Sequence, residues 1–192
     1  MRGHSLRRGL IGPAVTLSVA LAGCTAGAGG PTAGWVEPGW MALVRQENER
    51  FQSGQIACYA EFGLTPVRAM GGSVGFVNLP EDAATQALLE EASAVCNERV
   101  PLPAHSVDKT LDDAAYGRMV ELRECIVAHG FELPEPPSAA TWKDSGLEYA
   151  WNPYQPLIDA GSSVISQKEL FALDQACPQP GPNFYARAPT GD

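Results

Sequence analysis

Apolar side chains recur through residues 38–62 at the spacing of a helix. Val44, Phe51 and Cys58 follow one another every seven residues, and charged side chains occupy positions between them. Because one helical turn takes 3.6 residues, this spacing places the three side chains on a single stripe that a helix can bury. The proline at the start of the range and Gly63 after its end favour those boundaries. We therefore expect the first helix here.

Residues 64–79 change to a pattern typical of strands. Two short apolar runs flank Gly71-Gly72, and paired glycines favour the tight turn of a β-hairpin. Pro66 has no N–H to donate to a neighbouring strand, so the first run is expected at an edge. The stretch therefore predicts one small β-hairpin.

Three further helices are indicated by apolar periodicity and by the residues at their ends. Pro80 opens the first of them. Thr110 begins a capping-box pattern for the second, which ends at Gly130. A fuller capping box at Ser166 starts the third, which ends before Pro178. The predicted fold class is therefore mainly α (α+β).

Prolines interrupt the chain before the last helix. Residues 133–137 contain three of them and must be extended. We expect this segment to brace the surface of the domain, the alternative being that it docks into the aromatic groove of a partner. Ser138 is placed to cap a short helix through Trp142, and residues 151–154 have the composition of a turn.

Four cysteines follow Cys24 in the chain, and four cysteines allow three pairings. Two of them stand five residues before a glycine that ends a helix, and each is followed by a helix that leads to the next cysteine. The chain is thus predicted to contain two similar helix–connection–helix halves braced by disulfides. If the halves are real, the natural pairing is Cys58–Cys96 and Cys125–Cys177.

The N-terminus has the pattern of an export signal. Arg2, Arg7 and Arg8 precede an apolar run from Leu10 to Ala22 that no acidic residue interrupts. As a helix this run would reach roughly 20 Å, which is short of the roughly 30 Å of a bilayer's hydrocarbon core. We therefore predict a signal peptide over residues 1–23.

The end of this signal, Leu21-Ala22-Gly23-Cys24, resembles the lipobox of bacterial lipoproteins. The resemblance implies that the Cys24 thiol receives diacylglycerol and that the chain is then cut before it. An ordinary signal peptide with a chance cysteine is the alternative. The Arg7-Arg8 pair also resembles a twin-arginine signal, which leaves the Sec and Tat routes both open.

The mature chain divides by composition into three parts. Residues 24–34 are expected to be the lipidated cysteine and a flexible tether, residues 35–178 a single globular helical domain, and residues 179–192 a Pro-rich tail. The leader contains three of the 13 Lys and Arg residues and none of the 22 Asp and Glu, so the mature formal charge is about −12. That charge disfavours nucleic acids and anionic lipid headgroups as partners.

Two local motifs suggest chemistry. Gly71-Gly72-Ser73-Val74-Gly75 matches the G-x-S-x-G elbow of α/β-hydrolases, which requires a buried strand before it and a helix directly after it. No such helix follows Ser73, so a hairpin turn is the expected structure. Cys125 and His129 have a spacing that can hold zinc. We expect instead a disulfide at Cys125 and a His129 that caps the helix end, with no metal or cofactor.

A set of aromatic residues is expected to fill gaps in a small core. The alternative is a third candidate site, in which these side chains line a groove for a sugar or peptidoglycan. The residues in question are Trp35, Trp40, Trp142, Tyr149, Trp151 and Tyr154.

The segment from Cys125 through Pro137, together with a later cysteine, resembles a group of small actinobacterial exported proteins and lipoproteins of uncharacterised function. That resemblance implies location and fold style, and no activity. We expect the chain to lie at the extracytoplasmic face of the cell membrane, held by lipid on Cys24. The leading hypothesis is a non-enzymatic interaction or accessory module for an envelope protein or the cell wall. A small-ligand or cell-wall glycan binder is the alternative, and a hydrolase using Ser73 is third.

Overall fold

The computed structural model describes residues 31–32, 34–107, 110–146 and 151–181. The expected mainly helical fold with one small antiparallel hairpin is confirmed. The helices are α1 (Gly39–Glu61), α2 (Ala83–Arg99), α3 (Asp113–Ala128), α4 (Ala139–Asp144), α6 (Gln155–Ala160) and α7 (Gln167–Ala176). The strands are β1 (Pro66–Arg68) and β2 (Val74–Phe76), and three short 3-10 turns are η1 (Met70–Gly72), η2 (Ala104–Val107) and η3 (Gly161–Ser163).

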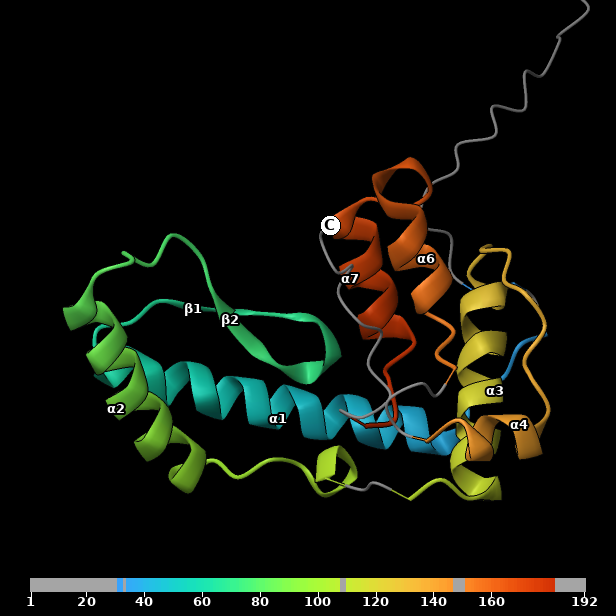
Figure 1. Cartoon of the computed structure of the whole chain (residues 1–192), viewed down its shortest axis with the longest axis horizontal. Helices are drawn as coiled ribbons and strands as arrows, with labels where there is room; N and C mark the ends of the chain where they lie inside the picture. The colour runs from blue at the N-terminus through green and yellow to red at the C-terminus, as the bar shows by residue number, and fades with distance from the viewer. Residues whose placement is uncertain (1–30, 33, 108–109, 147–150, 182–192) are drawn as a thin grey trace, which may run out of the picture.

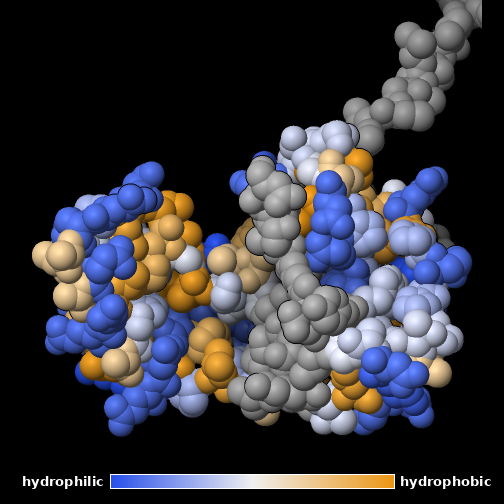
Figure 2. Space-filling model, viewed as in Figure 1, coloured by the Kyte–Doolittle hydropathy of each residue, from blue (hydrophilic) through white to orange (hydrophobic). Residues whose placement is uncertain are grey.

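The long helix α1 connects two groups of elements, each with its own core (Figure 1). Its first turns, through Met41, pack with α3, α4, α6 and α7 around Trp142, Leu122 and Tyr154. Its last turns, through Cys58, pack with α2 and the hairpin. In the space-filling view a notch separates the hairpin side from the α7 side (Figure 2).

Both expected disulfides are present. Cys58 bonds Cys96 across a sequence separation of 38 residues, and Cys125 bonds Cys177 across 52. Closing loops of this length removes chain entropy worth about 4 kcal/mol each from the unfolded state. Each bridge joins the last turns of one helix to the end of a later helix, as the two-halves interpretation requires.

The hairpin is held against α1 by a buried glutamine. Val67 of β1 pairs with Gly75 of β2 in antiparallel register. The Gln52 amide donates to the carbonyl oxygens of Ala69 (3.1 Å) and Ser73 (2.8 Å), which are the two ends of the hairpin loop. The Ser73 carbonyl also accepts from the Ala69 N–H at 2.9 Å, so Gln52 reinforces the closure of the loop and fixes it to α1.

The tip of the hairpin also contacts α7. The backbone N–H of Gly71 donates to a carboxylate oxygen of Asp174 at 2.8 Å, and Gln179 donates to the other oxygen at 3.3 Å. Asp174 is only 3% exposed, and this burial raises the pKa of its carboxyl group, against the lowering effect of the Gly71 N–H. Burial, and then the nearby Asp174 charge, raise the pKa of Tyr154 as well.

Several expected helix boundaries are confirmed. Gly63 and Gly130 follow α1 and α3 with φ of 74° and 91°, a conformation that glycine adopts without steric cost. Ser138 caps α4, which extends past Trp142 to Asp144, and Ser166 forms a complete capping box with Glu169 at the start of α7.

Two other helix starts were predicted wrongly. Helix α2 is capped by Asp82, whose side chain accepts from the Thr85 N–H, and it therefore begins three residues after Pro80. Helix α3 is capped by Asp112 rather than Thr110. Aspartate accepts as readily as threonine at an N-cap, so the capping-box pattern alone selected the wrong residue.

The last part of the described chain was also misjudged. Helix α6 occupies Gln155–Ala160, where no helix was predicted after the 151–154 turn. Gln179 and Pro180 are buried, so the packed chain extends beyond the boundary expected at residue 178. The Gln179 side chain accepts from Asn152, which ties this segment to the turn before α6.

The proline segment 133–137 is a surface brace in this structure. Arg123 on α3 donates to the carbonyl oxygens of Leu133 and Pro134 at 3.1 and 2.7 Å. The hydroxyl of Tyr116, also on α3, donates to the Pro137 carbonyl at 2.6 Å. The extended segment therefore lies along α3, as expected.

The predictions for residues 1–23, for Cys24 and for most of the 24–34 tether fall outside the described residues. So does the remainder of the tail, residues 182–192. Within the described ranges, no helix has both the length and the apolar composition needed to cross a bilayer.

Candidate functional site

One face of α1 borders two neighbouring cavities. Its residues at positions 40, 43, 44 and 47 line the first, and those at 47, 50 and 51 line the second. This spacing follows successive helical turns, so the two cavities extend over about 16 Å along one stripe of the helix. The rest of the lining comes from Arg99 at the end of α2, from the segment 100–105 that follows it, and from Arg118 and Pro180. We call these two cavities the α1 groove.

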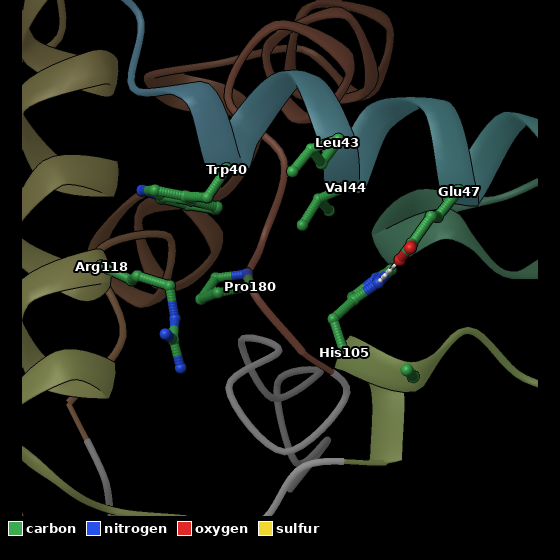
Figure 3. Close-up of a pocket in the computed structure, with 8 residues that line it drawn as sticks. Trp40, Leu43, Val44, Glu47, His105, Arg118 and Pro180 are labelled. Atoms are coloured by element: carbon green, nitrogen blue, oxygen red, sulfur yellow. Dashed lines mark hydrogen bonds and ion pairs between the residues drawn. The ribbon is translucent and has the colours of Figure 1, made fainter.

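The first cavity has a volume of about 270 Å³ (Figure 3). Its apolar lining comes from Trp40, Leu43 and Val44 on α1 and from Pro180 beyond α7. Arg118 of α3 lies on the same side as Trp40, and the Glu47–His105 pair lies on the opposite side. Three separate elements therefore contribute polar groups to one small space.

Glu47 and Ala104 line both cavities, and Glu47 contacts His105 of the first one. The Nδ1 atom of His105 lies 2.6 Å from a Glu47 carboxylate oxygen, and its Nε2 atom lies 3.2 Å from the Asn48 side-chain oxygen. Both partners on α1 are acceptors, so the imidazole can donate to both only when it is protonated. These contacts hold the η2 turn against α1.

Arg118 has a different environment. It is half-buried in the cavity wall, and no carboxylate lies within ion-pair distance of it among the residues that the structure describes. Its neighbour Glu121 accepts instead a short hydrogen bond from the Trp40 indole. Among the described residues, no acidic side chain therefore neutralises the Arg118 guanidinium.

The second cavity, of about 340 Å³, is more open to solvent. Arg50 and Phe51 line it on the α1 side, and Val100, Pro101 and Pro103 line the other. Prolines lack an N–H, so this wall offers few donors. The cavity is therefore an apolar trough with arginine side chains at its border.

Ser73 lies in the hairpin and not in a strand–helix elbow. It follows η1 directly and precedes β2, and its hydroxyl donates to the Met70 carbonyl at 2.8 Å. The expectation of a hairpin turn at this G-x-S-x-G motif is confirmed. The loop brings Ser73 to Gln52 and not to a histidine.

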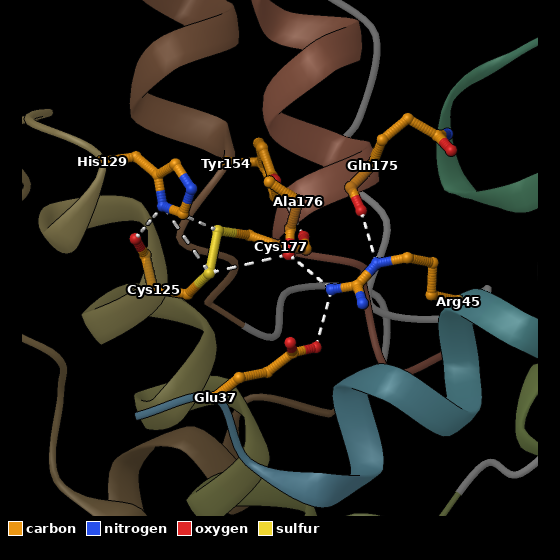
Figure 4. Close-up of a disulfide and its surroundings, with 8 residues drawn as sticks. All are labelled: Glu37, Arg45, Cys125, His129, Tyr154, Gln175, Ala176 and Cys177. Atoms are coloured by element: carbon orange, nitrogen blue, oxygen red, sulfur yellow. Dashed lines mark hydrogen bonds and ion pairs between the residues drawn. A yellow bond between two sulfur atoms is a disulfide. The ribbon is translucent and has the colours of Figure 1, made fainter. Parts of the chain in front are cut away.

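The Cys125–His129 pair belongs to a disulfide site (Figure 4). The ligand atoms of Cys125, His129 and Cys177 all lie within 4.8 Å of one another, but the two sulfur atoms are bonded to each other at 2.02 Å. His129 Nδ1 lies 2.8 Å from the Cys125 carbonyl oxygen, and because a carbonyl only accepts, Nδ1 must carry the proton. His129 therefore caps the end of α3, as expected, and neither sulfur is a free thiolate for a metal.

Most of the described aromatic residues fill the larger core, as expected, and do not form the alternative sugar groove. Trp142 is 1% exposed and Tyr154 is fully buried, and both belong to the larger core. The Trp142 indole donates to the Trp151 carbonyl, and the Tyr154 hydroxyl donates to the Cys177 carbonyl. Their polar atoms are thus satisfied inside the protein. Trp35 and Trp151 are half-buried and pack on the same core. Tyr149 is outside the described residues, and of the other five Trp40 alone lines the α1 groove.

The sequence analysis did not single out Arg118, Glu47 or Pro180. One sequence signal was available on α1, because Leu43, Glu47 and Arg50 repeat at intervals of four and three beside Trp40. The opposite wall of the groove comes from the loop after α2 and from the chain after α7. Helical periodicity in the sequence does not predict the position of either segment.

No protein-family model, no curated protein and no solved structure matches this chain.

Proposed function

We propose that this protein is an extracytoplasmic lipoprotein that acts as a non-enzymatic binding module at the cell envelope. In this proposal Cys24 carries the lipid, the mature chain begins at that residue, and the folded part remains close to the membrane surface. The α1 groove is the surface that engages a partner or ligand.

The proposed location is supported by two independent features. The sequence before Cys24 resembles a lipobox, and the folded part contains two disulfides whose four cysteines are at most 4% exposed. Disulfides of this kind form and persist in oxidising compartments outside the cytoplasm. An exported chain is therefore the simplest setting for this cysteine framework.

The proposed binding role depends on the α1 groove. Its first cavity combines an exposed leucine, a half-buried indole and an arginine without a carboxylate partner in the described chain. Apolar walls with a few converging polar groups are typical of ligand sites. This combination is the single observation that carries the proposal.

Photo-crosslinking in intact cells tests it. Leu43 is 62% exposed and lines the groove, so a photoreactive benzoylphenylalanine at this position should capture whatever occupies the groove. Val164 is 55% exposed and lies between η3 and α7, outside the lining of both cavities, which makes it a matched control. We expect a discrete crosslinked product in the membrane fraction from position 43 and none from position 164.

Identical products from both positions, or none from position 43, would contradict a binding role for the groove. A cytosolic location of the full chain would contradict the envelope proposal independently of the crosslinks.

A further inference from the structure

We infer that the first cavity binds a small organic anion, with a carboxylate against Arg118 and a flat apolar group against Trp40 and Leu43. This inference rests on the proposed function, and it adds the chemical class of the ligand. It is argued from the charges, the size and the walls of the cavity.

The charge argument begins with the arginines. Six lie in the described part of the chain, and four of them contact a glutamate at 2.6–2.8 Å. Those four pairs are Arg45–Glu37, Arg68–Glu49, Arg99–Glu61 and Arg123–Glu135. Of the other two, Arg50 is exposed to solvent, whereas Arg118 is half-buried in a cavity wall. In a chain with 22 acidic and 13 basic residues, a half-buried guanidinium with no acidic partner among the described residues is notable.

The acidic groups around the cavity are already engaged. Glu47 contacts the His105 ring, and Glu121 accepts from the Trp40 indole. Arg118 thus provides a positive charge in this wall that no acidic side chain of the described residues neutralises. A carboxylate can accept two parallel N–H bonds from a guanidinium, which fixes both its position and its plane.

The walls determine the rest of the ligand. Trp40 presents a flat aromatic surface, while Leu43, Val44 and Pro180 add aliphatic contacts. A volume of about 270 Å³ lies below the range of drug-sized pockets, so the cavity suits a single ring with its acid group. Benzoate has this size and chemistry and serves as the probe.

The experiment uses the full chain purified in a non-ionic detergent, with benzoate and its neutral analogue benzamide as ligands. Binding is measured by calorimetry and by the NMR signal of the Trp40 indole N–H. We expect benzoate to bind at least about tenfold more tightly than benzamide, since only benzoate pairs with Arg118. Arg118→Gln should remove this preference, and Arg118→Lys should retain part of it.

The matched control is Lys168→Gln, which removes an exposed positive charge at the start of α7, outside the lining of both cavities, and should leave benzoate binding unchanged. Equal binding of the two ligands, no shift of the Trp40 signal at millimolar benzoate, or an unaltered preference in Arg118→Gln would overturn the inference. If the crosslink from position 43 forms but the benzoate preference is absent, the binding module stands and the anion assignment fails.

Discussion

Single polar side chains of α1 fix the elements that pack on it. Arg45 donates from Nε to the Gln175 carbonyl at 2.9 Å and from Nη2 to the Ala176 carbonyl at 3.0 Å (Figure 4). Gln52 holds the hairpin loop, and the Gln55 amide donates to the Val100 carbonyl after α2 at 3.1 Å. Each satisfies backbone carbonyls at the end of an element, where no repeating ladder supplies a donor.

Replacing Arg45 by alanine should therefore destabilise the larger core. We expect a loss of about 1–2 kcal/mol in the free energy of unfolding, because two carbonyls at the end of α7 lose a charged donor. Arg50→Ala on the same helix is the control and should change stability by less than about 0.5 kcal/mol. Urea denaturation measures both, and equal effects would show that Arg45 does not cap α7.

Asp174 should make stability depend on pH. Burial raises the pKa of its carboxyl in the folded state, so its contribution is fully present below the unfolded pKa and is lost as pH rises through the folded value. The wild type should therefore gain stability relative to Asp174→Asn as pH falls from neutral toward 4. Unfolding free energies of both proteins across this range provide the test, and a difference that stays constant with pH would contradict it.

At the scale of elements, the sequence correctly predicted those features that depend on contacts between residues close together in the chain. The α1 and α3 ends at glycines, the Ser166 capping box and the hairpin follow from short-range backbone requirements. Helix α6 was not predicted from the sequence, because Asn152-Pro153 and Pro156 resemble a turn. Proline is nevertheless also suited to the first turn of a helix. Its buried Leu157 belongs to the larger core, a tertiary contact that sequence does not reveal.

The α1 groove was not predicted either, because it also depends on tertiary contacts. The seven-residue stripe correctly identified an apolar face, with Val44 and Cys58 buried and Phe51 half-buried. This stripe could not reveal that α1 packs into two separate cores. Nor could it reveal that the part of α1 between the cores borders the loop after α2. Arg118 and His105 reach that stretch from distant parts of the chain.

The hairpin loop provides a test at this scale. Gly72 has φ of 73°, and a Cβ there would overlap the Asn48 side chain of α1, so Gly72→Ala should cost about 1–3 kcal/mol. Gly75→Ala is the control, because its added Cβ meets only Ala69 at an ordinary 3.7 Å. Thermal unfolding of both variants measures the difference, and an unaffected Gly72→Ala protein would argue against this close approach.

The described part of the molecule has two small cores joined by one long helix, and each core contains one disulfide. The pairing could be predicted because the two halves repeat the same order of helix, cysteine and glycine. The way the halves meet could not, since it depends on single contacts such as Gly71 with Asp174.

Removing either disulfide should destabilise the protein by about 2–4 kcal/mol. Loop length alone separates the two bridges by only about 0.3 kcal/mol, because closure entropy varies with the logarithm of the loop. The Cys125→Ala/Cys177→Ala protein should nevertheless lose more stability than the Cys58→Ala/Cys96→Ala protein, since the Cys125–Cys177 bridge lies in the larger core. Urea midpoints of the two double variants decide this, and the reverse order would contradict it.

The proposed function depends first on the lipid anchor at Cys24, and metabolic labelling with a clickable fatty acid tests that anchor most directly. The full chain is expressed in a bacterium, and wild type is compared with Cys24→Ala by in-gel fluorescence and by the mass of the N-terminal peptide. We predict a labelled membrane protein that begins at Cys24, with Cys58–Cys96 and Cys125–Cys177 intact, and an unlabelled Cys24→Ala variant. An unlabelled wild-type chain in the cytosol with free thiols would contradict the account.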